Sequence, residues 1–115
     1  MVRGEIFLVE LDPVIGSEAN KTRPAVIVSS NAANDSAERR GRGVVTVVPL
    51  SSNIRNVFGF QVLLPMAESG LALDSKAQAE QVRSISTDRL VRQLGAVAAE
   101  RMLEIDDALR LHLSL

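Results

Sequence analysis

GVVTVVPL, residues 43–50, decides the fold, because four valines and a threonine fall within eight residues and favour an extended strand. Three shorter apolar runs lie on either side of it, each bounded by proline, glycine or polar residues. They are EIFLVEL at 5–11, PAVIVSS at 24–30 and FQVLLP at 60–65. These runs are too short and too β-branched for helices, so we predict four strands.

The segments between these strands differ in what they predict. VIGSEANKTR at 14–23 and SSNIRNVFG at 51–59 are polar and contain glycine and asparagine, so both are predicted as loops. NAANDSAERRGRG at 31–43 has room for one short helix, which its two glycines would end. GLALDSKAQAEQVRSIS at 70–86 has the Ala and Gln content of a helix but lies among short strands. Both structures fit this segment, and strands are favoured.

The C-terminal segment, AAERMLEIDDALRLHLSL at 98–115, is predicted as an amphipathic helix. Met102, Ile105, Leu109 and Leu113 recur at helical spacing, and charged residues occupy the positions between them. Short strands followed by one helix predict a mainly β domain over residues 1–115. The economical architecture is a curled antiparallel sheet or a small barrel, packed by the terminal helix.

Composition narrows the class of protein. The chain has 115 residues and no cysteine, which excludes disulfides, a thiolate nucleophile and cysteine metal sites. No apolar segment is long enough to span a membrane, and a cytoplasmic location is expected. The net charge of −1 argues against a generic nucleic-acid binder, so any RNA must be bound by a local patch. The basic run RRGR at 39–42 is either a solvated loop or such a contact.

The residue types exclude several catalytic schemes. His112 is the only histidine, and its place near the end of the predicted helix favours packing or a helix-end charge interaction. Metal sites built from several histidines are therefore excluded, and no phosphate-binding glycine motif is present. RNA cleavage by the substrate's own 2′-hydroxyl survives these exclusions. It needs positioning, charge stabilisation and proton transfers, but no metal or cofactor.

Three motifs occur in an order that resembles the MazF/PemK-type toxins of bacterial toxin–antitoxin systems. They are RGEIFLVELDPVIGSEANKTRPAVIVSS at 3–30, VVPLSSN at 47–53 and AEQVRSI at 79–85. The resemblance implies an SH3-like small antiparallel barrel with a C-terminal helix, of the CcdB/PemK-like kind, assembled as a homodimer. It also implies a metal-independent endoribonuclease, an mRNA interferase that cuts single-stranded RNA at short sequences. The products would carry 2′,3′-cyclic phosphate and 5′-hydroxyl ends, and a MazE-like antitoxin would block the RNA groove.

The resemblance assigns roles to individual residues. Arg23, directly before a proline, stands at the family's catalytic arginine, and Ser51 stands where many members have a catalytic threonine. An error of one residue in this correspondence would exchange Ser51 for Ser52. Contacts with RNA are implied for Ser17, Asn20, Lys21, Thr22, Pro49, Ser52, Asn53, Gln81 and Ser84.

Each catalytic candidate also has a simpler interpretation. Arg23 is either a surface ion-pair residue or a clamp for phosphate charge, since a guanidinium stays protonated and is a poor free base. Ser51 either ends a strand or hydrogen-bonds the scissile phosphate. Glu18 either accepts the 2′-hydroxyl proton, for which no histidine is available, or only adjusts RNA docking.

Two other functions remain open at this point. A CcdB-like poison of DNA gyrase shares the fold and performs no chemistry, and fold alone does not separate it from a nuclease. An inactive member that only binds RNA is the other, because Ser51 departs from the family's threonine. Arg23-Pro24 together with a hydroxyl at Ser51 favours the nuclease, which needs both groups.

Overall fold

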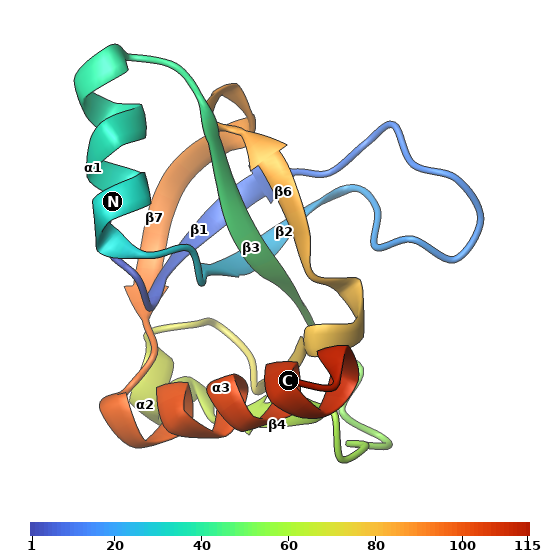
Figure 1. The fold of residues 1–115 in the computed structure, drawn as a ribbon. Coiled ribbons are helices and arrows are strands. Elements are labelled where there is room, and N and C mark those ends of the chain that lie inside the picture. Colours follow the sequence, from blue (N-terminus) through green and yellow to red (C-terminus); the bar gives the residue numbers. More distant parts are fainter.

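The computed structural model describes all 115 residues, and its centre is an antiparallel sheet of seven strands (Figure 1). The strands are β1 (Glu5–Glu10), β2 (Thr22–Ile27), β3 (Val44–Ser51), β4 (Gln61–Leu64), β5 (Ser75–Gln78), β6 (Arg83–Ser86) and β7 (Leu90–Ala96). The helices are α1 (Asn31–Arg40), α2 (Met66–Ser69) and α3 (Ala99–Leu113), with 3₁₀ turns at Ala79–Gln81 and Thr87–Arg89. The mainly β fold with a C-terminal helix is therefore confirmed.

The strand β3 organises the sheet, as its composition predicted. One edge of β3 pairs with β2, while the other edge pairs first with β6 and then, at its last two residues, with β5. The strand order is β4-β5-β3-β2-β1-β7, with β6 as a branch on β3. The strands at the two ends of this order do not pair with each other. The sheet is thus curled and open, which confirms the expected SH3-like curled antiparallel sheet with its terminal helix.

Several local predictions are confirmed. The segment 70–86 contains the strands β5 and β6 rather than a helix. The helix α1 begins after Ser30, whose side chain accepts a hydrogen bond from the Ala33 amide, and ends at Gly41 with a φ of 68°. A positive φ is the conformation that glycine adopts without strain, which explains why the helix ends there.

Two elements, α2 and β7, were not predicted. The strand β7 has the sequence LVRQLGA, and its Val91, Arg92 and Gln93 are all exposed. As an edge strand it needs no continuous apolar face, so its sequence carries little of the alternation that marks a strand. Only pairing with β1, which is distant in sequence, defines it.

The two faces of the sheet carry separate clusters of buried side chains. On one face, here called the helix face, Ile6, Val26 and Val48 pack with Ile105 and Ala108 of α3. The second cluster lies on the opposite face, and its members are Val9, Leu11, Ala19, Ala25, Ile27, Val45, Val47 and Ile85. Figure 1 shows α3 running along one side of the sheet, away from the long β1–β2 loop. No helix is long and apolar enough to cross a membrane.

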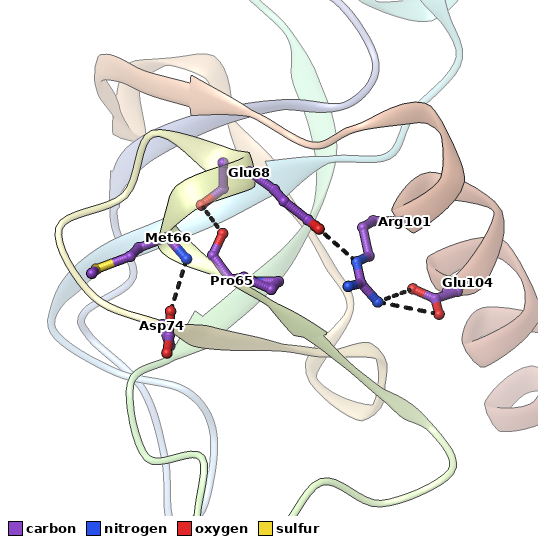
Figure 2. Close-up of polar contacts among 7 residues, drawn as sticks. Pro65, Met66, Glu68, Asp74, Arg101 and Glu104 are labelled. Carbon is purple, nitrogen blue, oxygen red and sulfur yellow. Dashed lines mark hydrogen bonds and ion pairs between the residues drawn. The ribbon is translucent and has the colours of Figure 1, made fainter.

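Figure 2 shows how α2 is held against α3. Arg101 of α3 donates hydrogen bonds to Glu68 at 3.0 Å and to Glu104 at 3.1 Å. The hydrogen bond to Glu68, and to a smaller extent the one to Glu104, raises the pKa of the Arg101 guanidinium above its already high ordinary value. The Met66 amide donates to Asp74 at 2.9 Å, which closes the turn that leads into β5. Exposed ion pairs of this kind orient a turn more than they stabilise a fold.

Candidate active site

Arg23, Ser51 and Lys76 form one row across three neighbouring strands. In the β2–β3 register Ala25 lies opposite Pro49, and continuing it by two residues places Arg23 opposite Ser51. In the β3–β5 register Ser51 lies directly opposite Lys76. Because side chains alternate along a strand, the three side chains share one face of the sheet. We call it the Arg23 face, and it is the face opposite α3.

Arg23 is half-buried and is held by one neighbour. Its Nε donates to the backbone carbonyl of Asn20 at 2.8 Å, and its Nη2 donates to the Asn20 side-chain oxygen at 3.1 Å. It forms no ion pair, which contradicts the simpler interpretation of Arg23 as a surface ion-pair residue. A guanidinium held by two neutral acceptors keeps its full charge for an anion.

The β1–β2 loop is fixed beside Arg23 by a residue from the far end of the sequence. Gln81 accepts a hydrogen bond from the Ala19 amide at 2.8 Å and donates to the Ser17 carbonyl at 3.1 Å. Both ends of the Gln81 amide are thus occupied by the loop. In this conformation Gln81 orders the loop, and its contact with RNA stays a prediction.

Glu18 lies at the exposed tip of the same loop. Its carboxylate accepts a hydrogen bond from the Ile15 amide at 2.7 Å and forms no ion pair. The neighbouring candidates Ser17, Lys21 and Thr22 are exposed as well, and Lys21 has a φ of 65°. The sequence candidates between 17 and 22 therefore form one accessible segment next to Arg23.

Ser51 and Ser52 lie on opposite faces. The Ser51 hydroxyl accepts a hydrogen bond from the Asn53 amide at 3.1 Å and lies in the row with Arg23. Ser52 is exposed and lines a cavity of about 420 Å³ together with Pro24, Leu50 and Arg92. Pro24 and Leu50 alternate with Arg23 and Ser51 along their strands, so this cavity opens on the helix face. Of the two serines, Ser51 is the one whose strand position lies on the Arg23 face.

Three further candidates are placed differently. Pro49 is buried opposite Ala25 and lies on the Arg23 face, two residues before Ser51 along β3. Asn53 is exposed and accepts a hydrogen bond from the Arg55 amide at 3.3 Å. Ser84 shares a hydrogen bond of 3.0 Å with Thr46, whose side chain alternates with Val45 and Val47 and so lies off the Arg23 face. Ser84 is therefore not brought to the Arg23–Ser51 pair.

The remaining polar groups lie outside the row. Arg39, Arg40 and Arg42 are exposed at the end of α1, next to the start of β3. Because Ser51 ends this strand, a distance of about 23 Å separates the basic run from it at the usual rise per residue. His112 lies on the last turn of α3, with its ring 6.5 Å from that of Phe60. No three carboxylate or histidine side chains are grouped as a metal site would require.

Lys76 is the residue that sequence reasoning missed. It lies in the segment whose structure was ambiguous, so neither its face nor its neighbours were predictable. The usable signal is the alternation SKAQ of β5, in which Lys76 and Gln78 share one face. That signal becomes informative only once the register with β3 is known.

Comparison with known proteins identifies relatives over the whole chain. Residues 2–113 match the family described as PemK-like, MazF-like toxin of type II toxin-antitoxin system. Endoribonuclease MazF9 of Mycobacterium tuberculosis (strain ATCC 25618 / H37Rv) is 58% identical over 115 residues, which cover 100% of this chain and 98% of the relative. Endoribonuclease MazF of Staphylococcus epidermidis is 30% identical over 98% of this chain and 91% of its own length.

Solved structures show the same fold. MazF from Deinococcus radiodurans matches 100% of this chain and 97% of its own, with a TM-score of 0.83 and 24% identity. An endoribonuclease in complex with its cognate antitoxin, from a mycobacterial species, matches 100% of this chain and 96% of its own. Its TM-score is 0.75 and its identity 26%.

Proposed function

Since the chain belongs to the PemK-like, MazF-like toxins of type II toxin–antitoxin systems, we propose that it is an endoribonuclease that cuts single-stranded RNA at short sequences. The observation that carries the proposal is the β2–β3 register, whose continuation puts an arginine without an ion-pair partner opposite a serine hydroxyl. This pair meets the two needs of cleavage by an internal nucleophile, which are positioning of the phosphate and stabilisation of its charge.

In the proposed reaction the 2′-oxygen of RNA bonds to the adjacent phosphorus while the bond from phosphorus to the 5′-oxygen breaks. A base takes the 2′-hydroxyl proton and an acid gives a proton to the departing 5′-oxygen. The products are a 2′,3′-cyclic phosphate and a 5′-hydroxyl. Arg23 binds the nonbridging oxygens as negative charge grows on them, and the Ser51 hydroxyl donates a hydrogen bond to the same phosphate.

Glu18 is the proposed base, and its position supports two roles. Its carboxylate is exposed, lies on the loop that leads to Arg23 and is unpaired except for the Ile15 amide. That bond also closes the loop, so Glu18 either takes the 2′-hydroxyl proton or only shapes the loop that docks RNA. Glu18→Gln keeps the acceptor for Ile15 and removes the base. Full cleavage by this variant at every pH would exclude Glu18 as the base.

The proposal includes the partners that the family's members have. We expect a homodimer that binds a MazE-like antitoxin, works in the cytoplasm and needs no metal or cofactor. Support for self-association comes from α3, where Leu103 is 66% exposed and Leu111 61% exposed. Leu113 and Leu115 are exposed as well, so the C-terminal end of the chain offers apolar surface that a second copy can cover. Leu111→Asp should lower the dimer fraction in sedimentation experiments while the fold is kept.

One experiment separates the nuclease from the gyrase poison and from an inactive binder. The purified protein is incubated with RNA in EDTA, and the product ends are identified by mass spectrometry. We expect cyclic phosphate and 5′-hydroxyl ends, no cleavage when the nucleotide at the cut site is 2′-deoxy, and cleavage about 1000-fold slower by Arg23→Ala. Products with 3′-hydroxyl ends would contradict the mechanism, and intact RNA would contradict the enzymatic function.

A further inference from the structure

Lys76 is a nearly buried cation that no carboxylate neutralises. Its residue surface is 8% exposed, and its ammonium donates to the Asn56 carbonyl at 2.8 Å. The ammonium also lies 6.0 Å from the centre of the Phe58 ring, at the outer limit of a cation–π contact. None of the ion pairs in the structure includes Lys76.

This environment leaves the charge of Lys76 poorly compensated. An ammonium has three N–H donors, and the Asn56 carbonyl accepts from only one of them. Burying a cation without a paired anion is costly, so an anion that reaches the ammonium is bound favourably. Asn56 and Phe58 are exposed, so the ammonium contacts two accessible residues of the loop that follows Ser51.

The position of Lys76 indicates which anion it takes. Ser51 lies between Arg23 on β2 and Lys76 on β5, and adjacent strands are about 4.8 Å apart. A phosphate bound by Arg23 and Ser51 occupies one side of the row. An RNA backbone that continues along the row reaches Lys76 with its next phosphate. We propose that Lys76 binds a non-scissile phosphate, adjacent to the one held by Arg23 and Ser51. This inference rests on the proposed function.

The proposal predicts a specific kinetic effect. A phosphate that does not react is bound equally in the ground state and the transition state, so losing its contact raises KM and leaves kcat unchanged. One fewer phosphate contact should also lower the slope of log affinity against log salt by about 0.7 for a single strand. Arg23, which contacts the reacting phosphate, should instead affect kcat.

Three substitutions separate phosphate binding from a merely structural role. Lys76→Gln removes the charge but keeps an N–H donor for the Asn56 carbonyl. Lys76→Arg keeps the charge, and Lys76→Met removes both charge and donor. If Lys76 only held the loop, Gln would behave like the wild type and the salt slope would not change. If Lys76 binds phosphate, Lys76→Gln and Lys76→Met lower the salt slope by the same amount, and Lys76→Arg keeps the wild-type slope.

The experiment uses the full chain and a short RNA made uncleavable by one 2′-deoxy nucleotide at the cut site. Binding is measured by fluorescence anisotropy over a series of KCl concentrations. In a set of such RNAs, single phosphates are replaced in turn by uncharged methylphosphonate. We expect the wild type to lose affinity when the phosphate next to the cut site is replaced, and Lys76→Gln to be indifferent to that replacement alone.

The control is Arg110→Gln, which removes one exposed positive charge from α3. It should keep the wild-type salt slope and the wild-type response to every methylphosphonate. A Lys76→Gln variant that kept the wild-type slope, while the wild type cuts RNA normally, would overturn the inference and leave the nuclease intact. Failure of the wild type to cut RNA would instead contradict the proposed function.

Discussion

Gln81 holds Ala19 across 62 residues of sequence, because its side-chain oxygen accepts the Ala19 amide at 2.8 Å. Ala19 is itself buried among the side chains on the Arg23 face. The bond therefore fixes the far end of the β1–β2 loop to the 3₁₀ turn that precedes β6. The loop that carries Glu18 is thus held by the protein's own side chain, which reduces the entropy cost of ordering it around RNA.

The first prediction concerns this bond. Gln81→Leu removes both hydrogen bonds and leaves the buried Ala19 amide unpaired, a local cost of about 1–3 kcal/mol. Exchange of the amides at 17–19 should accelerate by roughly one to two orders of magnitude, and RNA cleavage should weaken through KM. Hydrogen exchange followed by NMR measures the first effect. Gln93→Leu on the edge strand β7 is the control, and unchanged exchange in Gln81→Leu would contradict the role assigned to Gln81.

The second prediction separates the charge of Arg23 from its shape. Arg23→Lys keeps the positive charge but loses the planar fork that binds two phosphate oxygens at once. Single-turnover cleavage should fall by about 100-fold, and by about 1000-fold in Arg23→Ala, the range found when a group that binds a developing oxyanion is removed. Arg40→Lys, at the end of α1, is the matched control and should cut like the wild type. Equal rates for Arg23→Lys and the wild type would show that charge alone suffices.

The third prediction follows from the opposite faces of Ser51 and Ser52. Ser51→Ala should lower the cleavage rate by about 100-fold, because the lost hydroxyl lies in the row with Arg23. Ser51→Thr keeps the hydroxyl and should retain activity. Ser52→Ala changes the cavity on the helix face and should leave the rate unchanged. The reverse pattern, with only Ser52→Ala inactive, would show that the register places the wrong serine at the site.

The fourth prediction tests packing between β7 and α2. A Cβ atom at Gly95 would clash with the Ser69 carbonyl oxygen, at a distance of 2.0 Å. The backbone of α2 or β7 would have to move to make room for it. Gly95→Ala should therefore lower the free energy of unfolding by about 3 kcal/mol or more, measured by urea denaturation. Gly59→Ala meets only a Leu111 methyl at 3.6 Å, an ordinary contact, and should change stability little. Equal stability of the two variants would contradict tight packing between β7 and α2.

Much of the fold was predictable because a few segments carry strong local signals. The valines of β3 and the helical spacing of Met102, Ile105 and Leu109 predicted a sheet and the helix that covers it. The edge strand β7 was missed because its exposed residues need no apolar alternation. That the end strands β4 and β7 stay unpaired was also not predictable, since it depends on how segments distant in sequence pair.

The candidate site was likewise predictable only in part. The motif order predicted Arg23 and Ser51, but not that Asn20 holds the guanidinium or that Gln81 is used by the loop. Lys76 was missed because a residue's face follows from strand register, which is a long-range property. Local patterns predict which residue types are present, while pairing between distant strands decides which of them meet.

The alternation of β3 ties catalysis to packing more tightly than a site built on loops would. The strand presents Val48 and Leu50 to the core under α3, and between and beyond them Pro49 and Ser51 to the Arg23 face. A slip of one residue would turn Leu50 out of the core and put Ser52 in place of Ser51. An insertion or deletion in this strand that put the wrong serine at the site would therefore also disrupt the packing under α3.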